Sequence, residues 1–143
     1  MRILEAATKT VDDSLVETKH TGLGYNIVLR GDRGVCDDNQ DTYARAAKFA
    51  IDANPAGKSV AWIGGGLCVG PKVFAIAGCR QTVYEIEPAL AEFCPEGVRF
   101  VPGDWQATIR GQFDVIVYDL GGEVDKALLT PHLAPGGLIL GAD

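Results

Sequence analysis

The sequence predicts an α/β domain of the Rossmann-like type, a three-layer α-β-α sandwich in which helices cover both faces of a mostly parallel sheet. Three observations support this class. An apolar run at 59–63 leads directly into three glycines and a helix start. A second run at 81–87 completes a β-α-β unit, and the most strand-like run of the chain follows at 113–120. Strands that alternate with helical segments favour a parallel sheet.

The composition is that of a globular protein. The 143 residues are 47% hydrophobic and 22% charged, which argues against disorder. The net charge is −6 and the lysines and arginines do not cluster, so we expect a small or cationic substrate rather than nucleic acid. No apolar run reaches the roughly 18 residues that a membrane span needs. Residues 1–5 lack the apolar stretch of a signal peptide, so we expect a cytoplasmic protein without membrane contact.

The cysteines give no sign of a metal or redox site. Cys36, Cys68, Cys79 and Cys94 show no C-x-x-C spacing and no neighbouring histidine. Neither a zinc site nor a redox-active dithiol is therefore predicted, and we expect reduced and mostly buried thiols.

The first 36 residues predict a small β-meander. Short β-like runs at 3–6, 14–18 and 25–29 alternate with turns. Two interpretations stay open for 1–36: a flap over a ligand site, or a structural lid on the sheet. Residues 37–143 then form the Rossmann-like domain.

The segment 37–54 predicts a helix, because Tyr43 and the alanines after it recur at helical spacing. Its acidic start, with Asp37, Asp38 and Asp41, suits either helix capping or a Mg²⁺ site. Carboxylates in a first helical turn are expected because they cap the helix and complement its dipole. Capping is therefore favoured, and no metal is predicted.

The three glycines Gly64, Gly65 and Gly66 allow a sharp turn and a close approach of the backbone to a ligand. Pro71 suits the first position of the helix that follows. A helix start behind a glycine turn attracts anionic or electron-rich groups, which predicts a nucleotide-type site. A purely structural turn is the alternative.

Acidic residues follow the next predicted strands, at the edge where ligands bind in open α/β sheets. Glu85 lies about 20 residues after the glycine turn, the spacing at which an acid meets ribose hydroxyls. Glu87 fits better as the start of the helix 88–93, and a plain surface acid is the alternative for Glu85. Asp104 can accept a hydrogen bond from an exocyclic amine beside the flat face of Trp105, or it caps a short helix through Ile109.

Asp119 follows the strand 113–120 at the same edge. It is the best candidate for a general base or for holding a cationic amine. The segment 125–133 predicts a helix that bends or ends near Pro131, and a last strand follows at 138–141. That strand would be an exposed apolar edge, so we expect a second copy of the chain or the N-terminal meander to cover it. A homo-oligomer is the resulting prediction.

These segments resemble the class I methyltransferase superfamily that binds S-adenosylmethionine, and within it the spermidine synthase branch. The resemblance covers about residues 35–143 and implies a sheet of order 3-2-1-4-5, truncated after the fifth strand. It rests on the strand and glycine turn at 60–66, VYEIEPAL at 83–90, VRFVPGD at 98–104, FDVIVYDL at 113–120 and LAPGG at 133–137. The branch is indicated by Trp62-Ile63, where many methyltransferases carry an acid, and by the preceding helix with Tyr43.

The resemblance implies S-adenosylmethionine as the cofactor and assigns the site residues. The glycines would face its methionine part, Glu85 the ribose hydroxyls and Asp104 the adenine amine. Asp119 matches the catalytic aspartate, and Tyr43 joins it in the catalytic set. The cofactor-binding set is Gly64, Gly65, Gly66, Glu85, Ile86, Asp104, Trp105 and Asp119.

Two positions depart from the synthase pattern. Leu67 stands where synthases carry an aspartate after the glycines, and Gly122 stands in place of a second aspartate after Asp119. Both changes weaken recognition of an aminopropyl donor and a diamine, so methyl transfer to a small molecule is favoured, with an amine as one candidate acceptor. A non-catalytic cofactor-binding homologue is one alternative. An NAD-dependent oxidoreductase is another, although its fingerprint needs a glycine where Val69 stands.

Overall fold

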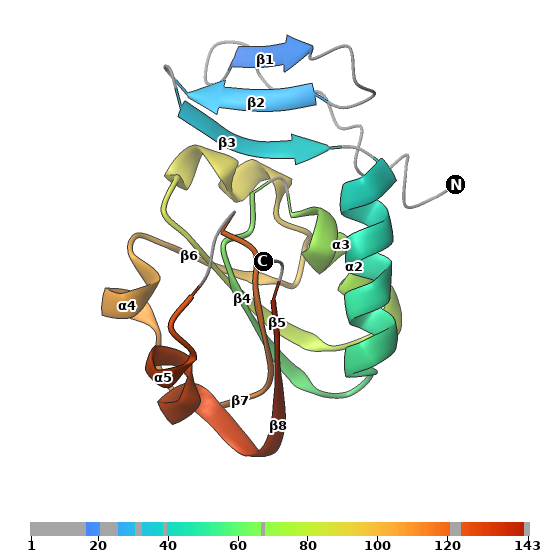
Figure 1. The fold of residues 1–143 in the computed structure, drawn as a ribbon, viewed down its shortest axis with the longest axis vertical. Coiled ribbons are helices and arrows are strands. Elements are labelled where there is room, and N and C mark those ends of the chain that lie inside the picture. The colour runs from blue at the N-terminus through green and yellow to red at the C-terminus, as the bar shows by residue number, and fades with distance from the viewer. Residues whose placement is uncertain are drawn as a thin grey trace.

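The computed structural model describes residues 17–20, 26–30, 33–38, 40–66, 68–120 and 124–141, and it describes side chains only from Arg45 onward. These residues form an antiparallel sheet of three strands and a parallel sheet of five strands with helices around it (Figure 1). No helix in the described part of the chain is long and apolar enough to cross a membrane.

The larger sheet has the strand order β6-β5-β4-β7-β8, and each neighbouring pair is parallel. Numbered along this sheet alone, the order is 3-2-1-4-5, which confirms the prediction. The strands are β4 (Ser59–Ile63), β5 (Arg80–Glu85), β6 (Arg99–Pro102), β7 (Phe113–Tyr118) and β8 (Leu133–Gly141). The helices are α2 (Gln40–Ala53), α3 (Val69–Ala77), α4 (Trp105–Thr108) and α5 (Lys126–Leu129), with the 3-10 helices η1 (Pro88–Phe93) and η2 (Thr130–His132).

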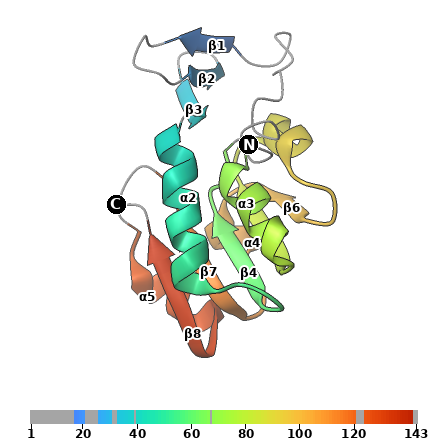
Figure 2. The same ribbon diagram turned by 90° about the vertical axis from the view of Figure 1, so that its right-hand side faces the viewer.

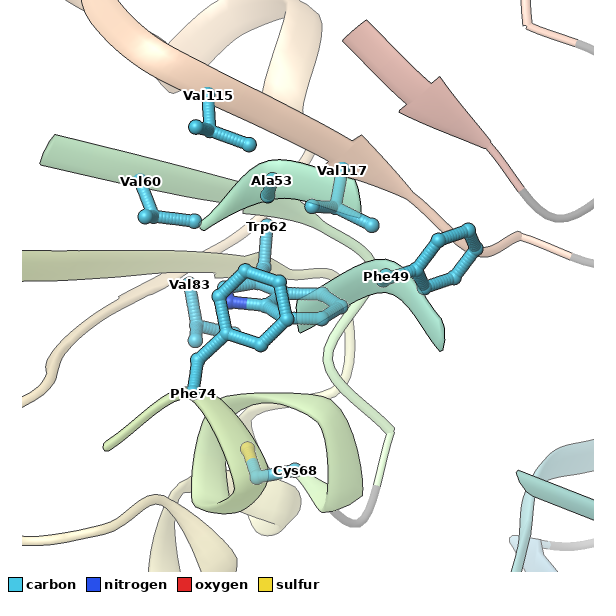
Figure 3. Packing of buried hydrophobic residues seen from close by; sticks show 9 residues of the cluster. All are labelled: Phe49, Ala53, Val60, Trp62, Cys68, Phe74, Val83, Val115 and Val117. Atoms are coloured by element: carbon cyan, nitrogen blue, oxygen red, sulfur yellow. The ribbon is translucent and has the colours of Figure 1, made fainter. Parts of the chain in front are cut away.

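The central strand β4 sends alternate side chains to two hydrophobic clusters. Val60 and Trp62 pack with Phe49 of α2 and Phe74 of α3 on one face (Figure 3). Ala61 and Ile63 pack on the other face, in a cluster that includes Leu129 of α5. Both faces of the sheet are therefore covered, which gives the three-layer sandwich that the sequence predicted.

Trp62 ties three elements together within the first cluster. Its ring meets Phe74 edge-on, with the centroids 4.8 Å apart. Its Nε1 donates to Gln81 Oε1 at 2.7 Å, and Gln81 Nε2 donates to the Pro71 carbonyl at 2.9 Å. This hydrogen-bond chain satisfies two buried polar groups and links β4, β5 and α3.

The N-terminal strands β1 (Glu17–His20), β2 (Asn26–Arg30) and β3 (Arg33–Asp38) form an antiparallel meander. Figures 1 and 2 show it at the end of the molecule toward which β4 and β8 point. Residues 1–16, with the predicted run at 3–6, lie outside the described residues. The predicted division after residue 36 falls within β3.

The start of α2 corrects one sequence prediction. Asp37 and Asp38 are not in a first helical turn, because they pair with Ile27 and Asn26 of β2 and so end β3. The helix begins at Gln40, and Asp41 alone of the three acids belongs to it. The side chains of these residues are not among those described, so the metal question stays a prediction.

Other element boundaries also differ from the predicted ones. The helix α3 begins at Val69 rather than at Pro71, because Cys68 directly before it adopts a left-handed conformation, with φ 60°, and caps the helix there. Pro71 is therefore in the third helical position. The run 125–133 divides into α5 and η2, and β8 already begins at Leu133.

The strand β8 forms one edge of the parallel sheet. Among the described strands it pairs with β7 alone, and the meander forms a separate sheet. The described strands of the meander therefore do not extend the sheet at β8, which is contrary to one of the two expectations. The other expectation, a second copy of the chain, stays a prediction.

Candidate functional site

The glycine turn after β4 lies at the centre of the carboxyl edge of the sheet. Gly64 has φ 86° and Gly66 φ 54°, a left-handed region that favours glycine. A Cβ on Gly64 would lie 2.5 Å from Leu120 Cδ2 and 2.8 Å from the Asp119 carbonyl oxygen. A Cβ on Gly65 would lie 2.5 Å from Val83 Cγ1. The turn is therefore packed tightly between the chain after β7 and strand β5, so packing alone already requires glycine here.

Glu85 ends β5 and is hydrogen-bonded directly to this turn. Its Oε1 accepts from the Gly66 N–H at 3.0 Å, and its Oε2 accepts from the Glu87 N–H at 2.8 Å. The residue is only 7% exposed, so it is not a plain surface acid. Two backbone donors compensate for the burial of its charge. The ribose role stays a prediction, and the geometry places its carboxylate against the glycines.

Asp119 lies directly after β7, on the other side of the turn. Its backbone N–H donates to the Ile63 carbonyl at 3.0 Å, which fixes it beside the end of β4. Its Oδ2 lies 3.3 Å from the Arg45 Nη2 in an ion pair, with the side chains 33% and 40% exposed. Arg45 comes from α2, so a cation and an anion from distant parts of the chain meet at this edge.

Asp104 follows β6 and caps α4. Its side chain accepts from the Gln106 N–H at 2.9 Å, which is the capping alternative that the sequence left open. Its adenine role stays a prediction. The neighbouring Gly103 N–H donates to the Glu85 carbonyl oxygen at 3.0 Å, so Asp104 lies close in space to the end of β5. Trp105 packs partly against the second core cluster, and Ile86 is 55% exposed.

Three residues of the sequence analysis cannot be placed in the site. The side chain of Tyr43 is not among those described, although its backbone belongs to α2. Leu67 and Gly122, the two departures from the synthase pattern, lie outside the described residues. Among the side chains that the structure describes, no group of three or more potential metal ligands comes together.

Two features of the site were missed by sequence reasoning. Arg45 of α2 was not among the predicted site residues, yet its side chain reaches Asp119. Cys68 and Cys94 belong to the same hydrophobic cluster, with Cys68 beside the glycine turn, although no cysteine motif links them. A contact between residues so far apart in the chain has no signal in spacing, because only the folded sheet brings α2 and η1 to the same edge as the turn.

Comparison with protein-family models and with curated protein sequences finds no match to this chain. Solved structures do match. The glycopeptide N-methyltransferase MtfA has a TM-score of 0.57 at 25% identity, over 68% of this chain and 52% of that chain. The precorrin 8W decarboxylase from Methanobacterium thermoautotrophicum has a TM-score of 0.61 at 17% identity, over 72% of this chain and 62% of that chain.

A third match is a SAM-dependent methyltransferase from Thiobacillus denitrificans, solved in complex with S-adenosyl-L-homocysteine. Its TM-score is 0.56 at 22% identity, over 68% of this chain and 47% of that chain. The aligned part of this chain thus spans between 47% and 62% of the length of these three proteins. The finer resemblance to spermidine synthases stays a prediction. The fold of this chain is the Rossmann-like fold that the methyltransferases among these structures share.

Proposed function

We propose that this chain binds S-adenosylmethionine at the carboxyl edge of its parallel sheet and transfers the methyl group to a small molecule. The observation that carries the proposal is the hydrogen bond between the Gly66 N–H and Glu85 Oε1, 3.0 Å long. This hydrogen bond joins the glycine turn after β4 to the acid that ends β5. In α/β sheets that bind nucleotides, an acid at this place binds the ribose, and the glycine turn lies next to the charged group of the same ligand.

The donor set of Glu85 is compatible with a ribose. Each carboxylate oxygen accepts one backbone N–H and keeps a second acceptor position, so two hydroxyls could donate to the same carboxylate. Hydrogen bonds to an ionised carboxylate are stronger than neutral ones. The Gly66 N–H, in contrast, already donates to Glu85, so the charged end of the ligand must bind to other groups.

The pair of Asp119 and Arg45 supports methyl transfer. Bound S-adenosylmethionine would supply a methyl group activated by a sulfonium. Asp119 would take the proton that the acceptor gives up, and Arg45, 3.3 Å from its Oδ2, would hold that carboxylate in position. A diamine would have to compete with the guanidinium for the same carboxylate. Methyl transfer is therefore favoured over aminopropyl transfer.

Binding of the demethylated product tests the proposal. Titration of the reduced full-length chain with S-adenosylhomocysteine in a calorimeter should give a saturable signal, and titration with NADH should not. Turnover is then measured with radiolabelled S-adenosylmethionine and separate amine, thiol and hydroxyl acceptors. Binding without turnover across the three classes would favour the non-catalytic homologue. Absence of S-adenosylhomocysteine binding would overturn the proposal.

The variant Asp119→Asn separates catalysis from binding. We expect it to bind S-adenosylhomocysteine normally but to lose about 10²- to 10⁴-fold in turnover, the usual contribution of a general base. Asp125→Asn, which changes the exposed cap of α5, is the matched control and should keep full activity. Undiminished turnover in the Asp119 variant would assign this carboxylate a structural role.

A further inference from the structure

A guanidinium lies beside the acids at the carboxyl edge of the parallel sheet. It belongs to Arg45 of α2, and Figure 2 shows that this helix begins at the end of the molecule toward which β4 and β8 point. The Arg45 Nη2 lies 3.3 Å from Asp119 Oδ2, and the two side chains are 40% and 33% exposed. The ion pair is therefore half-exposed at the candidate site, where a ligand can reach it.

The ion pair uses only part of this guanidinium. Toward the described part of the chain, Arg45 donates one hydrogen bond, from Nη2 to Asp119. A guanidinium carries several N–H donors in a planar fork, which matches the geometry of a carboxylate. The remaining N–H groups of Arg45 can therefore donate to a second carboxylate, one that a ligand brings.

The acids at the same edge, in contrast, already have donors. Glu85 is nearly buried and accepts from two backbone N–H groups. Asp104 accepts from the Gln106 N–H, and Asp119 is paired with the guanidinium. A cationic ligand would have to displace one of these donors, whereas an anionic ligand would not. The local charges of the site thus favour an anion, although the net charge of −6 suggested a cation.

We propose that Arg45 selects acceptors that carry a carboxylate next to the nucleophile that is methylated. This inference rests on the proposed function and names its substrate class. The nucleophile would gain the methyl group and give its proton to Asp119, and S-adenosylhomocysteine would be left as the other product.

The distances allow one acceptor to reach both residues. A nucleophile that donates to Asp119 Oδ2 lies about 3 Å from this oxygen. The Arg45 Nη2 lies 3.3 Å from the same oxygen, so the nucleophile and Nη2 are at most about 6 Å apart. A carboxylate on the atom beside the one that bears the nucleophile spans this gap. An ammonium in its place would be repelled by the guanidinium.

Three pairs of small aromatic probes test the selection. Salicylate and phenol, anthranilate and aniline, and thiosalicylate and thiophenol each share a nucleophile and differ by the carboxylate beside it. Each probe is titrated into the complex of the full-length chain with S-adenosylhomocysteine, and NMR follows the isotope-labelled arginine side chains. We expect each carboxylate to shift the Arg45 signal and to bind about tenfold more tightly than the other member of its pair.

Variants of two cations on α2 separate a direct contact from a general effect of charge. Arg45→Gln should remove the preference for carboxylates, and Arg45→Lys, which keeps the charge but not the fork, should keep part of it. Lys48→Gln is the matched control, because it removes a charge from an exposed position about one turn further along the same helix. It should bind the probes as the natural chain does. An equal loss of preference in the Lys48 variant would overturn the proposal.

The variant Asp119→Asn should change probe binding in the opposite direction. It removes the negative charge that shares the guanidinium, so the carboxylate probes should bind about tenfold more tightly even though turnover falls. If Arg45 only fixes α2 to the end of β7, this variant should leave the binding of every probe unchanged or weaken it. Either of these results would contradict the proposed selection.

The outcomes distinguish this inference from the proposed function. If calorimetry detects no binding of S-adenosylhomocysteine, the proposed function fails, and the acceptor class fails with it. If S-adenosylhomocysteine binds but the two members of each pair bind equally, the acceptor class alone is wrong. The same conclusion follows if no probe binds at millimolar concentration, or if the preference for carboxylates persists in Arg45→Gln.

Discussion

Glu85 shows how much can depend on one side chain. Its carboxylate is nearly buried, and both of its oxygens accept from backbone amides of the segments that frame the site. A buried acceptor of this kind stabilises the turn whether or not a ligand is present, because removing it leaves two N–H groups unsatisfied. Stability and ligand binding are therefore expected to change together here.

The variant Glu85→Gln tests this coupling. The amide presents only one acceptor oxygen, so one of the two backbone donors loses its partner. We expect the free energy of unfolding to fall by about 1–3 kcal/mol and the affinity for S-adenosylhomocysteine to fall about tenfold. Urea denaturation and calorimetry measure the two effects, with the exposed Glu96→Gln as control. Unchanged affinity in a folded Glu85 variant would reject the ribose assignment.

Individual residues were predictable where the strand pattern fixed their place. The ends of β5 and β7 put Glu85 and Asp119 at one edge, as their apolar runs indicated. Arg45 was not predictable, since a long side chain on a half-exposed helix face can point in several directions. Asp104 illustrates a third case, in which one carboxylate suited two roles and the structure shows only the capping hydrogen bond.

At the scale of elements, the close contact of α3 with β4 depends on Gly70. A Cβ at this position would collide with the ring of Trp62. The dinucleotide fingerprint requires a glycine one position earlier, where Val69 stands. Gly70 instead allows the helix to pack closely against the strand. Helix type and existence were predicted, whereas the start of α3 was not, because the left-handed Cys68 has no sequence signature.

The variant Gly70→Ala should therefore separate α3 from the sheet. Overpacking against a rigid ring should cost about 3 kcal/mol of unfolding free energy, measured by urea denaturation. Gly78→Ala is a suitable comparison, because Gly78 ends the same helix with φ 77° and open space around it. Its cost should be about 1 kcal/mol, from backbone strain alone. Equal losses in both variants would contradict the packing argument.

A second contact between elements depends on the ionisation of a carboxyl group, that of Asp114. Asp114 Oδ2 accepts from the Ser59 N–H at 3.0 Å and from its hydroxyl at 3.2 Å, which joins the starts of β7 and β4. The backbone hydrogen bond from Ser59 is the main cause that lowers the pKa of Asp114. A carboxyl group whose pKa is lower in the folded chain stabilises it above the unfolded pKa, and loses this effect as the pH falls through the folded value.

We therefore expect the natural chain to lose more unfolding free energy than Asp114→Asn between about pH 5 and pH 2, the range around an ordinary aspartate pKa. Urea denaturation at a series of pH values measures the difference. Asp52→Asn, an exposed site on α2, should follow the natural chain. Parallel curves for the natural chain and the Asp114 variant would show that this contact does not respond to pH.

For the whole molecule, the open side of β8 is the feature that favours self-association. Among the described strands β8 has a neighbour on one side only, and Leu138 is 40% exposed on it. Exposed apolar edges pair with other chains unless a charge prevents it. The sheet order was predictable from the order of the motifs, but what covers its edge was not, because pairing between chains leaves no periodic pattern in one sequence.

We predict that the chain forms a homo-oligomer through β8, with a light-scattering mass above that of one chain. Leu138→Lys should lower this mass toward the monomer. Leu128→Lys, at a similarly exposed position on α5, should leave it unchanged. A monomeric mass for the natural chain at high concentration would contradict the prediction.

The position of β4 at the centre of the sheet also determines when the chain can fold during its synthesis. Its partner β5 follows soon after it, but its other partner β7 pairs Val60 with Val115 and emerges from the ribosome much later. Contacts between such distant residues form slowly. Until residue 118 is available, a nascent chain exposes one edge of its most buried strand, and this is the interval in which it is most open to aggregation and to capture by chaperones.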